Sequence, residues 1–122
     1  NGQRDNWNKS RNYIKNDVHY ILGKKKWKTV VTHNPDGEYG HTHHQMTSYI
    51  VSKDSRVDMN QLVYFGRYYK KKNLPNNLNS ISQSDLDKKM KLTKMYSSQS
   101  KVMDHLGHML PHENWVKAKD WR

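Results

Sequence analysis

Apolar residues follow a helical spacing near the start of the chain. Four of them fall on one face of residues 12–22, which predicts an amphipathic helix that stops at Gly23. These four are Ile14, Val18, Ile21 and Leu22. A β-branched and aromatic run over 27–32 then predicts a strand, and the breakers at 33–37 predict a polar turn.

The middle of the chain repeats this order of a helix followed by a strand. A second helix with an apolar side is expected from about 43 to 53, and a second strand over 61–65. Residues 73–84 are rich in Asn, Ser and Pro, which is typical of a loop.

The last third of the chain predicts one long helix and a helical tail. We expect the long helix to begin at Ser84, capped with the help of Asp87, and to run to about His105 before Gly107 ends it. Residues 108–122 are expected to form a last short helix. The alternation of helices and strands indicates an α/β fold, in which chemistry gathers beyond the carboxyl ends of the strands.

The balance of charges is strongly positive. The net charge is +11, from 22 Lys and Arg against 11 Asp and Glu. Lys outnumbers Arg by 17 to 5, and Arg is the preferred reader of phosphate and guanine, so we interpret the charge mainly as solvated surface and do not expect nucleic acid as the partner. The charge would still attract an anionic substrate or a membrane surface.

Other features of the composition limit the class of protein. The absence of Cys excludes disulfide scaffolds, Cys-based zinc sites and thiol nucleophiles. Leu, Ile, Val and Phe make up only 21 of 122 residues, which predicts a thin core supported by eight Tyr and four Trp. No apolar run approaches the ~18 residues that span a bilayer. The chain begins at Asn1, in mid-pattern, so we expect a piece of a larger protein.

Histidines are concentrated in the loop expected after the first strand. Four of the eight lie within residues 33–44, with acids such as Glu38 between them. Imidazole is the commonest ligand for zinc and similar ions. His41 and His44 are three residues apart, which at a helix start places both rings on one face, so that one can bind a metal while the other donates to a substrate. Tyr39 adds a phenol that can hydrogen-bond a developing oxyanion.

The same loop carries a resemblance to a known family. Residues 28–44, KTVVTHNPDGEYGHTHH, resemble the PIG-L/LmbE-like family of zinc-dependent N-acetylglucosaminyl de-N-acetylases, in which a strand and a T-H-N-like turn precede a G-E-Y-G-H-x-x-H motif. A run from 89 to 99 that ends in Y-S-S-Q, and the H-M-x-P-H-E-x-W run at 108–115, are also similar to the family. The resemblance covers about residues 1–121.

The resemblance implies a fold, a reaction and site residues. The fold would be a Rossmann-like parallel sheet between helices, and the reaction would be hydrolysis of an acetamide by water activated on Zn²⁺, giving an amine and acetate. His44, the second His of G-H-x-x-H, would be a zinc ligand. His41, the first, would stabilise the tetrahedral intermediate, with Tyr39 as a further catalytic group. Substrate contacts are expected from Arg4, Glu38 and Gln99.

The resemblance also implies a substrate and a cellular location, and this chain lacks one of the family's motifs. The substrate would be an N-acetyl amino sugar, anionic or lipid-linked, met in the cytoplasm or at the cytoplasmic face of a membrane. The family takes its other two zinc ligands and its general base from an H-P-D-D-E-like motif near the N-terminus, which this chain lacks. We therefore expect residues 1–122 to form a single domain that is the C-terminal part of a larger de-N-acetylase domain. The N-terminal strands of the sheet would then lie outside the chain.

Two other functions stay open. The positive charge and the His-rich loop also suit a basic nucleic-acid-binding module or a small His-Asn-His-like metal nuclease, although such nucleases use a ββα-metal arrangement. The chain can also be a degenerate, non-catalytic family member. Release of acetate would favour the deacetylase, and DNA binding with a steep salt dependence would favour the nucleic-acid module.

Overall fold

The computed structural model describes residues 6–122, so Arg4 lies outside the described residues. The chain divides into two compact units, Asn1–Phe65 with Val116–Arg122, and Gly66–Trp115. Within residues 6–122, no helix combines the length and the apolar character needed to cross a membrane. That the chain forms a single domain within a larger one stays a prediction.

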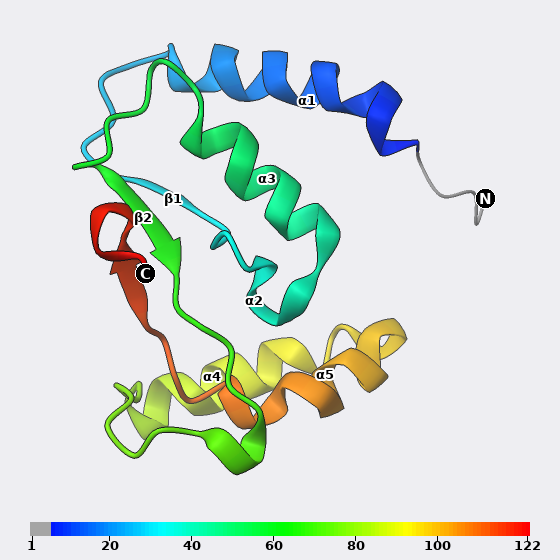
Figure 1. Ribbon diagram of the computed structural model, residues 1–122. Helices are drawn as coiled ribbons and strands as arrows, with labels where there is room; N and C mark the ends of the chain where they lie inside the picture. The colour runs from blue at the N-terminus through cyan, green and yellow to red at the C-terminus, as the bar shows by residue number, and fades with distance from the viewer. Residues whose placement is uncertain (1–5) are drawn as a thin grey trace. The chain divides into compact units, whose positions relative to one another are not determined.

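The first helix begins earlier than predicted. This helix, α1 (Trp7–Leu22), is capped by Asn6, whose side-chain oxygen accepts hydrogen bonds from the backbone N–H of Asn8 at 3.1 Å and of Lys9 at 3.4 Å (Figure 1). Asn is among the strongest N-cap residues, and it lies well before the apolar stripe that indicates the helix. The predicted stop is confirmed, because Gly23 is the C-cap.

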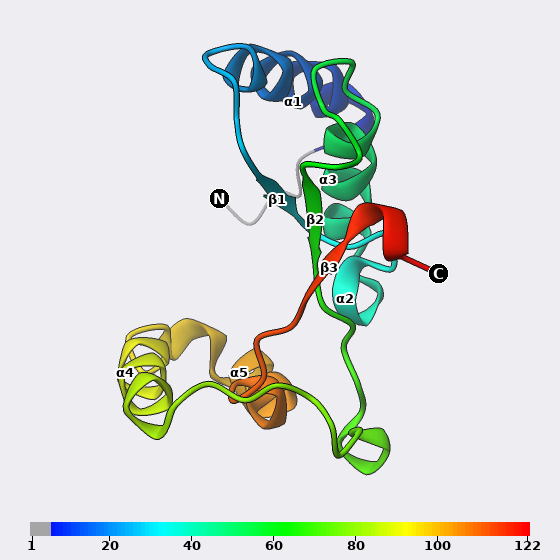
Figure 2. The same ribbon diagram turned by 90° about the vertical axis from the view of Figure 1, so that its left-hand side faces the viewer.

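Two parallel strands and a helix between them form the centre of the first unit. β1 (Val30–Thr32) and β2 (Leu62–Phe65) pair in parallel, with Val30 opposite Leu62. The helix α3 (Thr42–Ser52) joins them and packs against α1 and β1 (Figure 2). The predicted second helix and both predicted strands are confirmed, although β1 is shorter than its β-branched run.

The third strand makes the sheet mixed. β3 (Trp115–Lys117) lies next to β2 in the order β1-β2-β3 and runs in the opposite direction (Figure 1). The prediction of a short helix over 108–122 is wrong in this part, where a strand is followed by a 3₁₀ turn at Ala118–Asp120. An aromatic and a β-branched residue fit a strand as well as a helix, and pairing with the sheet decides between them. The α/β class agrees with this arrangement of helices and sheet.

The core of the first unit is small, as the composition predicts. Leu62 is fully buried, and the ring of Tyr64 meets the ring of Trp121 edge-on with centroids 5.6 Å apart. The buried cluster consists of Val51, Leu62, Tyr64 and Ala118, with Val18, Val30, Val57 and Trp121 packed against it. The two aromatic rings therefore supply much of the apolar surface that the few aliphatic residues lack.

The second unit is built around two helices rather than one. The single helix predicted over 84–105 is wrong, because α4 (Gln83–Thr93) and α5 (Ser100–Leu106) are separated by a turn. Tyr96 leaves the helical conformation there, at φ −93° and ψ 51°. The serines that follow it favour caps and turns because their hydroxyls compete for backbone hydrogen bonds.

The cap of α4 also differs from the prediction. Ser82, not Ser84, begins the helix, and its hydroxyl accepts a hydrogen bond from the backbone N–H of Asp85 at 3.1 Å. The same hydroxyl donates to Oδ2 of Asp85 at 2.8 Å, and Lys88 donates to Oδ1 at 3.2 Å. The hydrogen bond from Ser82, and then that from Lys88, lowers the pKa of Asp85 below its usual value.

Candidate metal centre

The loop that follows β1 turns tightly around two glycines. Gly37 and Gly40 have φ values of 67° and 91°, in the left-handed region that glycine adopts without strain. Glu38 lies between them at φ 55° and ψ −82°, a conformation that costs a non-glycine residue free energy. The short turn α2 (Gly37–Gly40) is therefore strained at the one residue whose carboxylate faces back toward the end of β1.

Asn34 holds this strained turn in place. Its side chain is fully buried, and its Oδ1 accepts a hydrogen bond from the backbone N–H of Glu38 at 3.0 Å. Its own backbone N–H donates to Oε1 of Glu38 at 3.0 Å, and its Nδ2 donates to the carbonyl of Phe65 at 3.2 Å. Asn34 thus joins the turn to the end of β2 and fixes the position of the Glu38 carboxylate.

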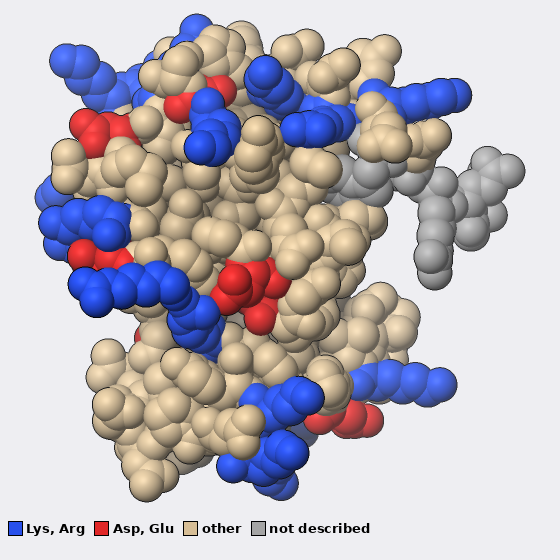
Figure 3. Space-filling view, in the orientation of Figure 1, with Lys and Arg blue, Asp and Glu red and all other residues tan. Residues whose placement is uncertain are grey.

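Two histidines meet the other oxygen of this carboxylate. Oε2 of Glu38 lies 3.0 Å from Nδ1 of His33 and 2.5 Å from Nδ1 of His44. The two imidazole rings stack, with centroids 3.9 Å apart and planes inclined by 12°. All three side chains are partly buried, and acidic side chains reach the surface in the region of α2 (Figure 3). The cluster is therefore ordered by the protein and still within reach of solvent.

The chemistry of this cluster fits a transition-metal ion. The ligand atoms that His33, Glu38 and His44 offer lie within 4.8 Å of one another. Two imidazoles and one carboxylate form a donor set of catalytic zinc sites, which leave a fourth position for water or substrate. A tetrahedral zinc ion with bonds of about 2.0–2.1 Å separates its ligand atoms by about 3.3 Å. Binding of the ion would therefore lengthen the distances from Oε2 of Glu38 to the two Nδ1 atoms. The distance to His44 would increase more than the distance to His33.

His41 and Tyr39 lie beside the cluster. The ring of His41 stacks on that of His44 with centroids 4.5 Å apart, which confirms that both rings share one face of the first turn. His41 is the N-cap of α3, and its Nδ1 accepts a hydrogen bond from the backbone N–H of His43 at 3.2 Å. Nε2 is therefore the ring nitrogen of His41 that could contact a ligand. The ring of Tyr39 meets His41 and His44 edge-on, at 5.9 Å and 5.7 Å between centroids.

A cavity of about 350 Å³ is lined in part by residues that neighbour the cluster in the sequence. Pro35 and Gln45 border it, and they directly follow Asn34 and His44. The hydroxyls of Ser52 and Tyr64, 2.8 Å apart, and the exposed ring of Tyr49 form further parts of its wall. Its size is within the range of small-molecule sites, and hydroxyls beside an aromatic ring suit a polar ligand with an apolar face.

The structure brings most of the predicted site residues together. Glu38, Tyr39, His41 and His44 all lie in the loop and first turn after β1, in the first unit. Gln99 lies in the second unit, exposed, in the 3₁₀ turn Ser97–Gln99. Their roles toward a substrate stay predictions, as does that of Arg4.

Sequence reasoning missed His33 and Asn34 as parts of the site. His33 is one of the four clustered histidines, yet no role follows from its spacing to His41 and His44. Its position directly after the strand is the signal that indicates it, since side chains at the carboxyl end of a parallel strand often line a site. The role of Asn34 depends on its burial against the carbonyl of Phe65, which the sequence does not show.

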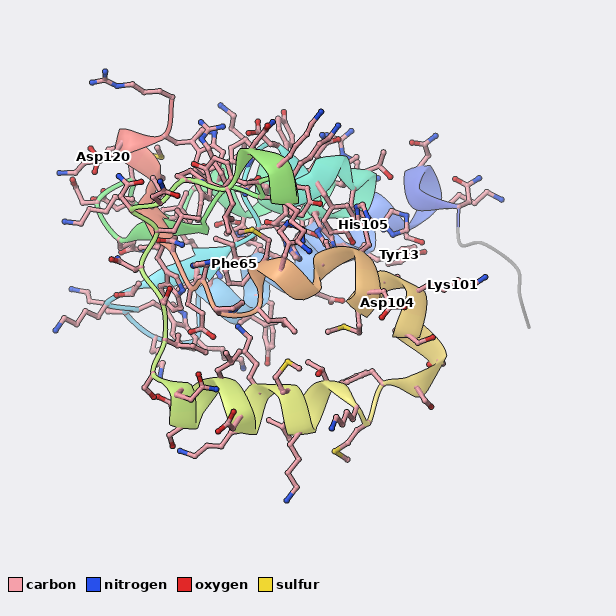
Figure 4. All side chains as sticks on the ribbon, turned by 90° about the horizontal axis from the view of Figure 1, so that it is seen from below. Tyr13, Phe65, Lys101, Asp104, His105 and Asp120 are labelled. Carbon is pink, nitrogen blue, oxygen red and sulfur yellow. The ribbon has the colours of Figure 1, made fainter. Side chains whose placement is uncertain are left out.

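The histidines of the second unit make hydrogen-bond contacts with other residues of the same unit. Figure 4 shows His105 on α5, together with Lys101 and Asp104. Nε2 of His108 lies 2.6 Å from the backbone carbonyl of Tyr69, and Nδ1 of His112 lies 3.3 Å from the hydroxyl of Ser80. These contacts favour a structural role for the histidines of the second unit, and among the described residues the group with metal-ligand spacing is His33, Glu38 and His44.

The comparisons with known proteins leave the family open. No family model matches the chain, and no solved structure matches it. The chain is 30% identical over 115 residues to the uncharacterized protein L374 of Acanthamoeba polyphaga mimivirus, a match that covers 94% of this chain and 44% of that protein. The chain thus spans less than half the length of this curated relative. Membership of the de-N-acetylase family stays a prediction.

Proposed function

We propose that this chain forms the metal-binding part of a zinc-dependent hydrolase that removes the acetyl group from an N-acetylglucosamine-type substrate. The observation that carries the proposal is the meeting of His33 and His44 on one carboxylate oxygen of Glu38. This grouping lies at the carboxyl end of a parallel strand, where α/β proteins hold their sites. The G-H-x-x-H resemblance supplies the reaction, and the donor set supplies the metal.

In this proposal His33, Glu38 and His44 hold the ion. This differs from the resemblance, which takes one ligand from this chain and two from a separate motif. A zinc ion held by these residues would supply Lewis-acid chemistry, polarising a carbonyl and lowering the pKa of water. Glu38 is fixed by Asn34 on its other oxygen, so the three donors are arranged before the ion binds.

His41 and Tyr39 act on the substrate in this proposal. The ring of His41 stacks on that of His44, which supports a role in which Nε2 of His41 donates a hydrogen bond to the oxygen that gains negative charge. The phenol of Tyr39 lies against the same two rings and provides a second donor. The 350 Å³ cavity beside Pro35 and Gln45 would receive the sugar, with its ring against Tyr49.

The proposed domain is larger than this chain. A β1–α3–β2 unit with a parallel pair of strands is the repeating element of a Rossmann-like sheet. The mimivirus relative is more than twice as long as the matched segment, which agrees with a domain longer than this chain. The same parallel pairing weighs against the ββα-metal nuclease, because that arrangement needs a hairpin of two antiparallel strands.

Acetate release tests the proposal. The protein in its natural length, loaded with Zn²⁺, is expected to release acetate from N-acetylglucosamine conjugates, and His44→Ala and His41→Ala are expected to abolish or strongly reduce release. His43→Ala removes a histidine from the same loop without touching the three proposed ligands, and it is the matched control. Undiminished release by His44→Ala, or equal loss in all three variants, would overturn the assignment.

A further inference from the structure

A second cavity lies at the opposite end of the strands from the metal cluster. It has a volume of about 670 Å³ and is formed by the end of α1, the loop after it, Arg56 and Gln61. The carbonyl of Gln61 accepts a hydrogen bond from the N–H of Val30 at 2.9 Å, so this cavity lies where β1 and β2 begin. His33 follows the other end of β1, and no residue is shared between the two sites.

The lining of this cavity is cationic. Lys25, Lys26 and Arg56 contribute three positive charges, and no carboxylate lines the cavity within residues 6–122. Asp54 and Asp58 are equally near to Arg56 in sequence, and neither lines the cavity. Asp54 is buried and accepts hydrogen bonds at 2.9 Å from the backbone N–H of Arg56 and at 2.8 Å from Nδ1 of His19, and Oδ1 of Asp58 accepts one from the backbone N–H of Asn60 at 2.7 Å. The three cations therefore face a space that lacks an anion of the described chain.

The arrangement is held by the end of α1. Nη1 of Arg56 donates to the carbonyl of His19 at 2.5 Å, which satisfies a carbonyl in the last turn of the helix and orients the guanidinium. The guanidinium crosses directly over Gly23, where a Cβ would lie 1.8 Å from Nη1 of Arg56. A methyl group at this position would therefore have to displace the end of the Arg56 side chain, and the guanidinium is positioned before any ligand arrives.

An aromatic ring completes the cavity. Nε1 of Trp27 donates to the carbonyl of Ile21 at 3.3 Å, which fixes the indole across the helix end. Nζ of Lys25 lies 4.2 Å from the centroid of the Trp27 ring, so the ammonium is held near the same surface. Lys and Arg side chains project around the loop between α1 and β1 in Figure 3.

We propose that this cavity binds a phosphate group. A guanidinium presents paired N–H donors that match two phosphate oxygens, and the two ammonium groups supply further charge-assisted hydrogen bonds. The flat ring of Trp27 covers the less polar part of the ligand. The phosphate comes either from a small phosphorylated molecule or from a phospholipid headgroup, which share this chemistry. The site uses none of the residues of the proposed hydrolysis and stands independently of it.

Calorimetric titration with inorganic phosphate tests the site. The double variant Lys25→Gln/Lys26→Gln is compared with Lys9→Gln/Lys15→Gln, which removes the same charge from exposed positions of α1. The first is expected to weaken binding by about tenfold or more, as for the loss of hydrogen bonds to a charged group, and the second by much less. Gly23→Ala leaves the net charge unchanged and is also expected to weaken binding, because its methyl group displaces Arg56.

Vesicles identify the source of the phosphate. Cosedimentation with vesicles that contain an anionic phospholipid, at physiological ionic strength, is measured for the same variants. Loss of vesicle binding in Lys25→Gln/Lys26→Gln alone supports the site with a headgroup as its ligand. Phosphate binding without vesicle binding supports it with a small molecule. Equal weakening in both double variants, or absence of saturable binding to phosphate and to vesicles, overturns the proposal.

Discussion

Oε2 of Glu38 lies 2.5 Å from Nδ1 of His44, and the backbone of Glu38 has a φ of 55°. The strained backbone of Glu38 thus brings its carboxylate into hydrogen-bond contact with the His44 ring. Strain of this kind persists only where surrounding contacts impose it, and such residues are concentrated at functional sites. The relationship between these two side chains is the basis of the proposed metal centre.

Removal of the carboxylate is expected to weaken metal binding. In Glu38→Gln one ligand oxygen loses its charge and the amide cannot accept hydrogen bonds in the same pattern, so zinc affinity should fall by at least about tenfold. Glu113→Gln, at an exposed partner of Lys89 in the second unit, makes the same chemical change away from the cluster. Equal zinc affinities of the two variants in a competition titration would contradict the role of Glu38.

Asn34 is expected to support both the fold and the metal. Asn34→Ala removes side-chain bonds to Glu38 and Phe65 from a fully buried position, which should lower the free energy of unfolding by about 2–3 kcal/mol. Asn60→Ala, at an exposed position, should change it by less than about 0.5 kcal/mol. Denaturant unfolding of both variants measures the difference, and similar stabilities would contradict this role of Asn34.

The conformation of Gly37 gives a test of the turn itself. Gly37→Ala places a Cβ at φ 67° and 2.7 Å from Cγ of Gln45, so we expect a loss of about 1–3 kcal/mol in the free energy of unfolding. Gly107→Ala is the matched control, because its φ of −55° is helical and no atom lies within 4 Å of the added Cβ. It should leave stability unchanged or raise it by up to about 1 kcal/mol. A destabilisation of both variants by the same amount would count against the strained turn.

The pKa of Asp85 gives a test in the second unit. Because this pKa is lowered in the folded chain, the interaction stabilises the fold above the unfolded pKa of about 3.9 and is lost as pH falls through the folded value. Ser82→Ala should return the pKa of Asp85 toward its usual range, and Ser84→Ala should not. An NMR titration of the Asp85 carboxyl group measures this, and an unchanged pKa of Asp85 in Ser82→Ala would contradict the cap at Ser82.

The elements that are local in sequence are those that sequence reasoning predicts. The stop at Gly23, the strand before His33 and the helix that presents His41 and His44 follow from spacing and breakers alone. The break at Tyr96 does not, because Lys94 and Met95 before it are residues that favour a helix. β3 does not either, because its conformation depends on pairing with β2.

The site was predictable as a loop but not as a set of ligands. The density of histidines marks residues 33–44, and G-H-x-x-H spacing puts His41 beside His44. That His33 and Glu38 join His44 as the candidate metal ligands depends on a positive φ at Glu38 and on the buried side chain of Asn34. Both are consequences of tertiary packing, which periodicity does not contain.

A zinc titration followed by calorimetry tests the central claim most directly. The metal-free chain is expected to bind one Zn²⁺, with binding abolished or strongly weakened in His33→Ala and in His44→Ala and retained in His43→Ala. X-ray absorption of the zinc-loaded chain should show imidazole nitrogens and a carboxylate oxygen as ligands. Zinc binding that is unchanged in His44→Ala, or lost only in His43→Ala, would show that His33, Glu38 and His44 do not form the metal centre.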